Sequence, residues 1–126
     1  MGEARELIAA LRELNRTPDR SVARFASSLV GMFGSNNMFE LFLFDVDAAL
    51  EAGSASDTLK RRARNLVHTF IPQVAGYNGI RDLRALKVTA EKLRAIHTDS
   101  PESRREGVET ILSALLQILD EVIKLG

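Results

Sequence analysis

The sequence contains no cysteine and no tryptophan, and it has only two histidines and one tyrosine among 126 residues. The absence of cysteine excludes disulfides, thiolate nucleophiles and cysteine-based zinc sites. Few groups remain that could act as an acid or a base near neutral pH. The sequence also has no Gly-x-Ser-x-Gly elbow, phosphate-binding loop or dinucleotide fingerprint. We therefore expect no catalytic residues and a non-enzymatic role.

The sequence also has no excess of positive or negative charge, because 17 Lys and Arg residues balance 17 Asp and Glu residues. Such a chain has no overall field that would attract nucleic acid or anionic lipid. The longest apolar runs, such as Leu41 to Phe44, are far shorter than the roughly 20 residues of a membrane span, and the charged start does not resemble a signal peptide. We expect a soluble, cytoplasmic protein that binds neither nucleic acid nor membranes.

What the sequence does contain is helical periodicity, with 45% apolar residues spread along nearly the whole chain. We expect an all-α fold, an irregular bundle of five to six helices in a single domain over residues 1–126. Serine and threonine caps predict helix starts, and Gly53 and Pro72 predict helix ends. The expected helical segments, in chain order, are 7–14, 18–33, 38–52, 59–71, 80–96 and 101–125. The first of these stops near Arg16. The fourth is capped by Ser54 or Ser56 and broken by Pro72.

Two of these segments are unusually apolar. Segment 38–52 carries too many apolar residues for one narrow stripe, so we expect it to be nearly engulfed by the rest of the protein. The last helix carries two apolar stripes, so it is either the central helix or one that also packs against another chain. The second stripe is our candidate interaction face for a protein partner or a homodimer, and it consists of Ile111, Leu116, Ile118 and Ile123.

Charged residues also cluster. Glu40, Asp47 and Glu51 share one helix face by their spacing, but the Glu-x-x-His motifs of di-iron bundles are missing, so we interpret this face as solvated and expect no metal site. The following helix carries a basic patch that either contacts a phosphate or an acidic partner or is simply solvated. This patch consists of Lys60, Arg61, Arg62 and Arg64.

The two histidines, His68 and His97, lie 29 residues apart, and Leu93 stands four residues before the second. This spacing is similar to that of the two haem-facing histidines of globins. The resemblance implies a ligand-binding or haem-binding helical bundle that uses both histidines. However, the chain ends where the last globin helix should begin, and Pro72 interrupts the helix one turn after His68. We expect no cofactor, with haem as the alternative.

A second resemblance involves the run Ala49-Leu50-Glu51-Ala52-Gly53 and the following Leu59-Lys60-Arg61-Arg62-Ala63, with Phe42-Leu43 before them. It is similar to histidine phosphotransfer domains, which implies a degenerate domain of that type as a further alternative. Arg64 occupies the position of the phospho-accepting histidine, and His68 comes one turn late. We therefore predict that His68 is not phosphorylated, but is partly buried and hydrogen-bonded.

The origin of the sequence stays open at this point. The repeated Thr-Pro and Ser-Pro-Glu caps and the absence of Cys and Trp are compatible with an engineered chain, whereas the phenylalanine-rich third segment and Pro72 differ from an idealised design. The leading hypothesis is a non-enzymatic helical interaction or regulatory module that binds a partner protein or a second copy of itself through apolar helix faces.

Overall fold

The computed structural model describes residues 2–16, 36–74, 83–96 and 100–125. Within these ranges the chain is helical apart from short connections, and it contains no strand. The all-helical expectation is thus confirmed for the described residues, while the expected helix over 18–33 lies outside them. The elements are α1 (Gly2–Arg16), α3 (Asn36–Ala52), α4 (Asp57–Phe70), the 3-10 turn η1 (Ile71–Gln73), α5 (Leu83–Arg94) and α6 (Pro101–Ile123).

The helix ends follow local backbone chemistry. Ser56 caps α4 and Ser100 caps α6, because their hydroxyl oxygens accept hydrogen bonds from the amides of Leu59 and Ser103 at 3.1 and 3.0 Å. Ser56, not Ser54, is therefore the cap of α4. Pro101 occupies the first turn of α6, where its missing N–H removes no helical bond.

Two helices end where glycine and proline require it. Gly53 follows α3 with a φ of 73°, a left-handed conformation, and its amide donates to the Ala49 carbonyl at 2.9 Å. α4 ends at Phe70, and the chain tightens into η1 around Pro72. A proline cannot donate the next helical hydrogen bond, so the expected break at Pro72 is confirmed.

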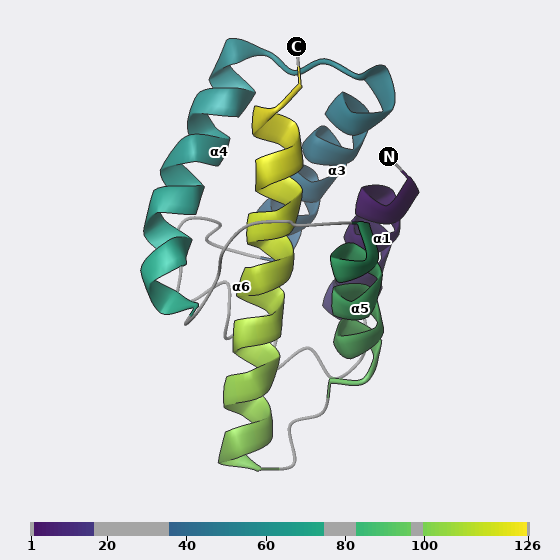
Figure 1. The fold of residues 1–126 in the computed structure, drawn as a ribbon, viewed down its shortest axis with the longest axis vertical. Helices are drawn as coiled ribbons and strands as arrows, with labels where there is room; N and C mark the ends of the chain where they lie inside the picture. Colours follow the sequence, from purple (N-terminus) through teal and green to yellow (C-terminus); the bar gives the residue numbers. More distant parts are fainter. Residues whose placement is uncertain (1, 17–35, 75–82, 97–99, 126) are drawn as a thin grey trace.

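Helix α6 lies between the other helices (Figure 1). It contacts α4 on one side and α1 and α5 on the other, and it also contacts α3 and η1. α1 packs in addition against α3 and α5. Of the two roles expected for the last helix, the central position therefore accounts for its two apolar stripes.

The core gathers one face from each outer helix around both stripes of α6. α1 contributes Leu7 and Leu11, and α5 contributes Leu86 and Leu93, all with at most 2% of their surface exposed. The hydrophobic effect rewards this burial at roughly 25 cal/mol per Å² of apolar surface. The buried side chains of α3, α4 and α6 include Phe39, Phe42, Leu43, Val46, Ala63, Leu66, Phe70, Leu112, Leu115, Leu119 and Val122.

None of the described helices is long and apolar enough to cross a bilayer. Even α6, the longest of them, carries charged side chains in its first half and near its end. The apolar residues of the described chain serve the core, with the exceptions described next.

Candidate functional site

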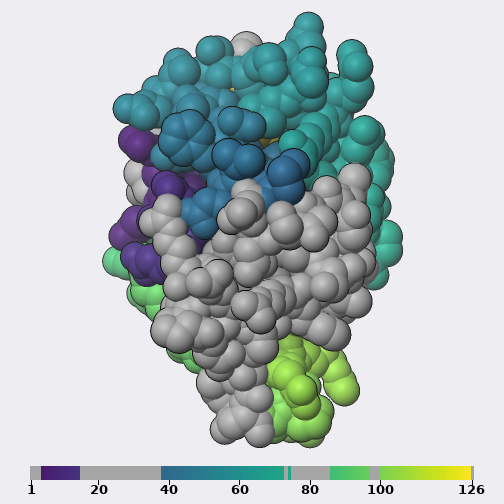
Figure 2. All heavy atoms as spheres, turned by 180° about the vertical axis from the view of Figure 1, so that it is seen from behind, coloured from purple at the N-terminus to yellow at the C-terminus, as the bar shows by residue number. Residues whose placement is uncertain are grey.

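The largest departure from expectation is on α3, which is not engulfed. Leu41 and Phe44 are each 58% exposed and Met38 is 48% exposed, whereas Phe39 and Phe42 on the other side of the helix are buried. Seen from behind, α3 lies at the surface of the molecule (Figure 2). We call Met38, Leu41, Phe44 and the exposed Ala48 the α3 apolar stripe, because these residues recur at intervals of three and four along one face.

Within the described ranges, α3 has helical neighbours on only part of its circumference, which leaves this stripe uncovered by them. Among the described elements α3 packs mainly against α1 and α6, which cover the side that carries Phe39, Leu43 and Val46. In the other parts of the chain that the structure describes, large exposed hydrophobic residues occur singly, as Ile71 in η1 and Val88 in α5. Isolated apolar residues are normal on protein surfaces, but a contiguous row suggests a binding surface.

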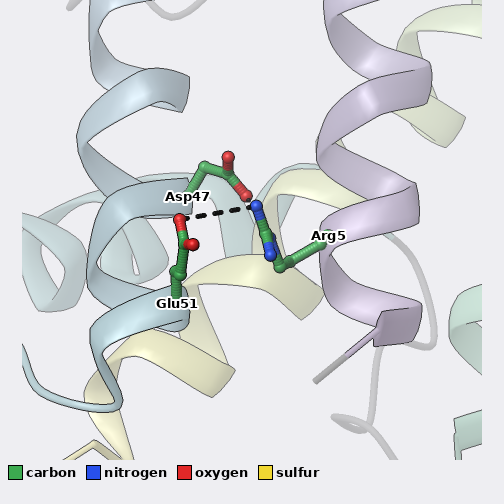
Figure 3. Close-up of polar contacts among 3 residues, drawn as sticks. All are labelled: Arg5, Asp47 and Glu51. Atoms are coloured by element: carbon green, nitrogen blue, oxygen red, sulfur yellow. Dashed lines mark hydrogen bonds and ion pairs between the residues drawn. The ribbon is translucent and has the colours of Figure 1, made fainter.

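Ion pairs with α1 line one edge of the α3 apolar stripe (Figure 3). Arg5 Nε donates to Asp47 Oδ1 at 2.9 Å, and Arg5 Nη2 lies 3.6 Å from Glu51 Oε2. The hydrogen bond to Asp47 raises the pKa of Arg5 above its ordinary value, the charges of Asp47 and then Glu51 raise it further, and desolvation slightly opposes them. The guanidinium therefore stays charged at any physiological pH.

A second pair extends the same edge, since Arg12 Nε donates to Glu40 Oε1 at 3.2 Å. The acidic face expected to be merely solvated thus pairs with two arginines of α1. A signal for this was present in the sequence, because Arg5 and Arg12 are seven residues apart, as are Glu40 and Asp47. No group of three potential metal ligands occurs in the part of the chain that the structure describes.

The interaction face expected on α6 is covered by the chain itself. Ile111, Leu116 and Ile118 are at most 1% exposed, and Ile123 is partly buried against the core. These side chains fill the space between α6 and its neighbours, so they cannot serve as a ready docking surface. The candidate apolar surface therefore moves from α6 to α3.

The four residues of the predicted basic patch lie on α4 but do not act alike. Arg62 is partly buried, and its guanidinium carbon lies 4.7 Å from the centre of the Phe42 ring, a cation–π contact that joins α4 to α3. Arg61 and Arg64 are exposed, and Lys60 is partly exposed. Arg62 is thus structural, while the other three remain on the surface.

His68 is exposed on α4, so the expectation of partial burial is wrong. The apolar neighbours Val67 and Phe70 face inward, but His68 falls on the same outward face as Arg64 and Arg61, which lie four and seven residues earlier. His97 lies outside the described residues, and so does any contact between the two histidines. The structure therefore gives no geometry for a shared ligand.

The side chain of Gln117 is a buried polar group that takes part in none of the ion pairs described above. Gln117 of α6 is only 9% exposed, and its Oε1 atom accepts no hydrogen bond from the described residues. An unsatisfied buried oxygen costs free energy, on the order of 1–3 kcal/mol. Sequence reasoning missed this residue, because its position places it on the more polar edge of α6.

No protein-family model matches this chain, and comparisons with the curated proteins and with the solved structures found no match either.

Proposed function

We propose that the protein is a non-enzymatic helical interaction or regulatory module of the cytoplasm. In this proposal the helices form an irregular bundle and a single domain, which binds a partner protein or a second copy of the chain through the α3 apolar stripe. The observation that carries the proposal is the exposure of Leu41 and Phe44 at 58% each on the same helix face.

The chemistry around the stripe supports an apolar partner. The neighbouring acidic residues Glu40 and Asp47 already pair with arginines of α1, so docking there leaves few charges uncompensated. Asp45 is exposed beside the stripe and is the acidic group that a partner would meet directly. An amphipathic helix with a basic residue opposite Asp45 satisfies both requirements.

Replacing Leu41 and Phe44 together by Gln tests this proposal. The matched control replaces Ile71 and Val88, whose exposure is similar, at 47% and 49%, but which lie outside α3. Quantitative affinity capture followed by reconstitution from purified components compares the two variants with the unaltered chain, and sedimentation measures self-association. We expect binding to be lost in Leu41→Gln/Phe44→Gln alone. Equal binding by all three proteins would refute a role for the α3 apolar stripe.

One specific observation supports a second candidate function, phosphotransfer by His68. Phosphotransfer requires an accessible imidazole near a cation, and His68 is exposed one helical turn after Arg64. Incubation with a small phosphodonor, followed by intact mass measurement, tests it with His68→Gln as the control. We expect no modification, and an acid-labile phosphate that His68→Gln abolishes would establish the degenerate phosphotransfer alternative.

Haem or small-ligand binding through His68 and His97 gains no such observation, because His68 is exposed and His97 lies outside the described residues. The visible absorption spectrum of the freshly purified protein decides this alternative directly. A Soret band that His68→Gln and His97→Gln both remove would establish it.

A further inference from the structure

The outward face of α4 carries cations that form no ion pair with an acidic side chain among the described residues. Lys60, Arg61, Arg64 and His68 recur at intervals of one to four residues on this face, and we call them the α4 cationic stripe. None of these four side chains forms an ion pair within the described residues. By contrast, Arg5, Arg12 and Arg94 each lie within 4 Å of a carboxylate.

Local energetics disfavour this arrangement. Lys60 and Arg61 lie in the first half of α4, nearer the end of the helix whose dipole disfavours cations. Lys60 and Arg64 are also like charges four residues apart, an arrangement that destabilises a helix by a few tenths of a kcal/mol. Within α4 itself, Asp57 in the first turn is the only acidic residue that offsets them. A local rule broken without compensation among the described residues points to a functional surface.

The complementary surface lies on the same chain, at the other end of the molecule. Glu102, Glu106 and Glu109 are exposed along one face of the first half of α6, and we call them the α6 acidic stripe. None of the three forms an ion pair within the described residues. The start of α6 extends beyond the end of α4 (Figure 1), so this stripe projects away from the α4 cationic stripe of its own chain.

The two stripes match in register. Arg61, Arg64 and His68 are separated by three and then four residues, and Glu109, Glu106 and Glu102, taken in the reverse direction, are separated by the same intervals. Two antiparallel helices would therefore bring all three pairs together at once. The chain already uses this kind of match, because the equal seven-residue spacing of α1 and α3 pairs Arg5 with Asp47 and Arg12 with Glu40.

We propose that the α4 cationic stripe binds the α6 acidic stripe of a second copy of the chain. The two helices lie antiparallel, and Arg61 pairs with Glu109, Arg64 with Glu106 and His68 with Glu102. Each copy carries the two stripes at different levels along its helices (Figure 1), so the contact joins copies head to tail and leaves one stripe free at each end. Exposed ion pairs contribute little individually, so the association is weak and sensitive to salt. This contact does not involve α3 and does not rest on the function proposed above.

Charge reversal of each stripe, alone and in combination, tests the proposal. Sedimentation at low ionic strength compares the unaltered chain with Arg61→Glu/Arg64→Glu and with Glu106→Arg/Glu109→Arg. We expect each variant alone to self-associate at least about tenfold more weakly, and an equimolar mixture of the two to regain association. Raising the salt from about 0.01 M to about 1 M shortens the Debye length from about 30 Å to about 3 Å and should dissociate the unaltered chain.

A matched control distinguishes association that depends on the match between the two stripes from attraction by net charge alone. Lys87→Glu/Lys92→Glu makes the same charge change on exposed positions of α5. It should self-associate like the unaltered chain, and its mixture with Glu106→Arg/Glu109→Arg should associate less than the complementary mixture. Circular dichroism checks folding, and Arg61→Glu/Arg64→Glu should not lower the thermal midpoint, because both positions are exposed and the change removes the like-charge pair of Lys60 and Arg64.

Two results would overturn the proposal. The first is an unaltered chain that stays monomeric at low salt, or one whose self-association neither reversal changes. The second is equal association in the complementary and control mixtures, which would show attraction by net charge alone. Loss of binding in Leu41→Gln/Phe44→Gln has no bearing on these results, because that variant leaves both charged stripes intact.

Discussion

Helices α3 and α6 are both rich in apolar residues, yet they occupy opposite environments. α6 contacts α1, α3, α4 and α5, and apolar side chains around much of its circumference are buried. α3 buries Phe39, Phe42 and Val46 but exposes Leu41 and Phe44. Apolar density therefore does not determine how deeply a helix is buried. The number of sides on which a helix meets neighbours determines it, and the surplus apolar residues of a helix with few neighbours form a surface.

The sharpest test of this comparison replaces one leucine in each helix. Leu115→Ala removes a side chain that is 2% exposed and should lower the free energy of unfolding by about 2–5 kcal/mol, because a cavity replaces core contacts. Leu41→Ala removes a side chain that is 58% exposed and should change it by no more than about 0.5 kcal/mol. Denaturant unfolding measures both. Similar losses for the two variants would show that α3 is covered in solution.

The end of α3 offers the next largest effect. Gly53→Ala should destabilise the protein by about 1–2 kcal/mol, because a side chain disfavours the left-handed conformation of this residue. No atom lies within 4 Å of the added methyl group, so the cost comes from the backbone alone. Gly53→Asn is the matched control, since asparagine tolerates this conformation better. Thermal unfolding should rank glycine above asparagine and asparagine above alanine.

On α6, a substitution that removes the buried oxygen of Gln117 should stabilise the protein. Gln117→Met keeps the shape of the side chain and removes the unsatisfied Oε1 atom, so we expect the free energy of unfolding to rise by about 1 kcal/mol. Ser113→Ala, at a partly exposed position one turn earlier, is the control and should have a small effect. A clear loss of stability in Gln117→Met would show that the oxygen has a hydrogen-bonding partner.

The smallest expected effect concerns the edge of α3. A double-mutant cycle with Arg12→Ala and Glu40→Ala should give a coupling energy of about 0.2–1 kcal/mol, because the pair is only partly buried. Denaturant unfolding of the four proteins yields this coupling, and about 1 M salt should reduce it. A coupling of zero would mean that the pair does not hold α1 against α3.

Much of the helical framework could be predicted because its signals are local. Ser56 and Ser100 act as caps through hydrogen bonds that reach three residues along the chain, and Pro72 breaks α4 through its own missing amide hydrogen. The buried face of α5, with Leu86 and Leu93, follows from helical spacing in the same way. Such interactions need no knowledge of the rest of the fold.

The candidate site could not be predicted in this way. His68 follows apolar Val67, yet it is exposed, because Ala63, Leu66 and Phe70 define the inward face of α4. The interaction face expected on α6 is buried, while the α3 apolar stripe was expected to be covered. Spacing alone cannot decide between two apolar faces of one helix, since each fits the same periodicity.

The sequence by itself determined that the described chain is helical, that Gly53 and Pro72 end helices and serine caps begin them, and that cysteine chemistry is absent, whereas α1 begins at Gly2, earlier than the expected segment 7–14. Only the tertiary structure decided which helix is central and which keeps an apolar face exposed, and it paired the carboxylates of α3 with Arg5 and Arg12. The physical reason is the distance along the chain over which each effect acts. Capping and periodicity act within a few residues of the chain, whereas burial depends on which surfaces the other helices occupy.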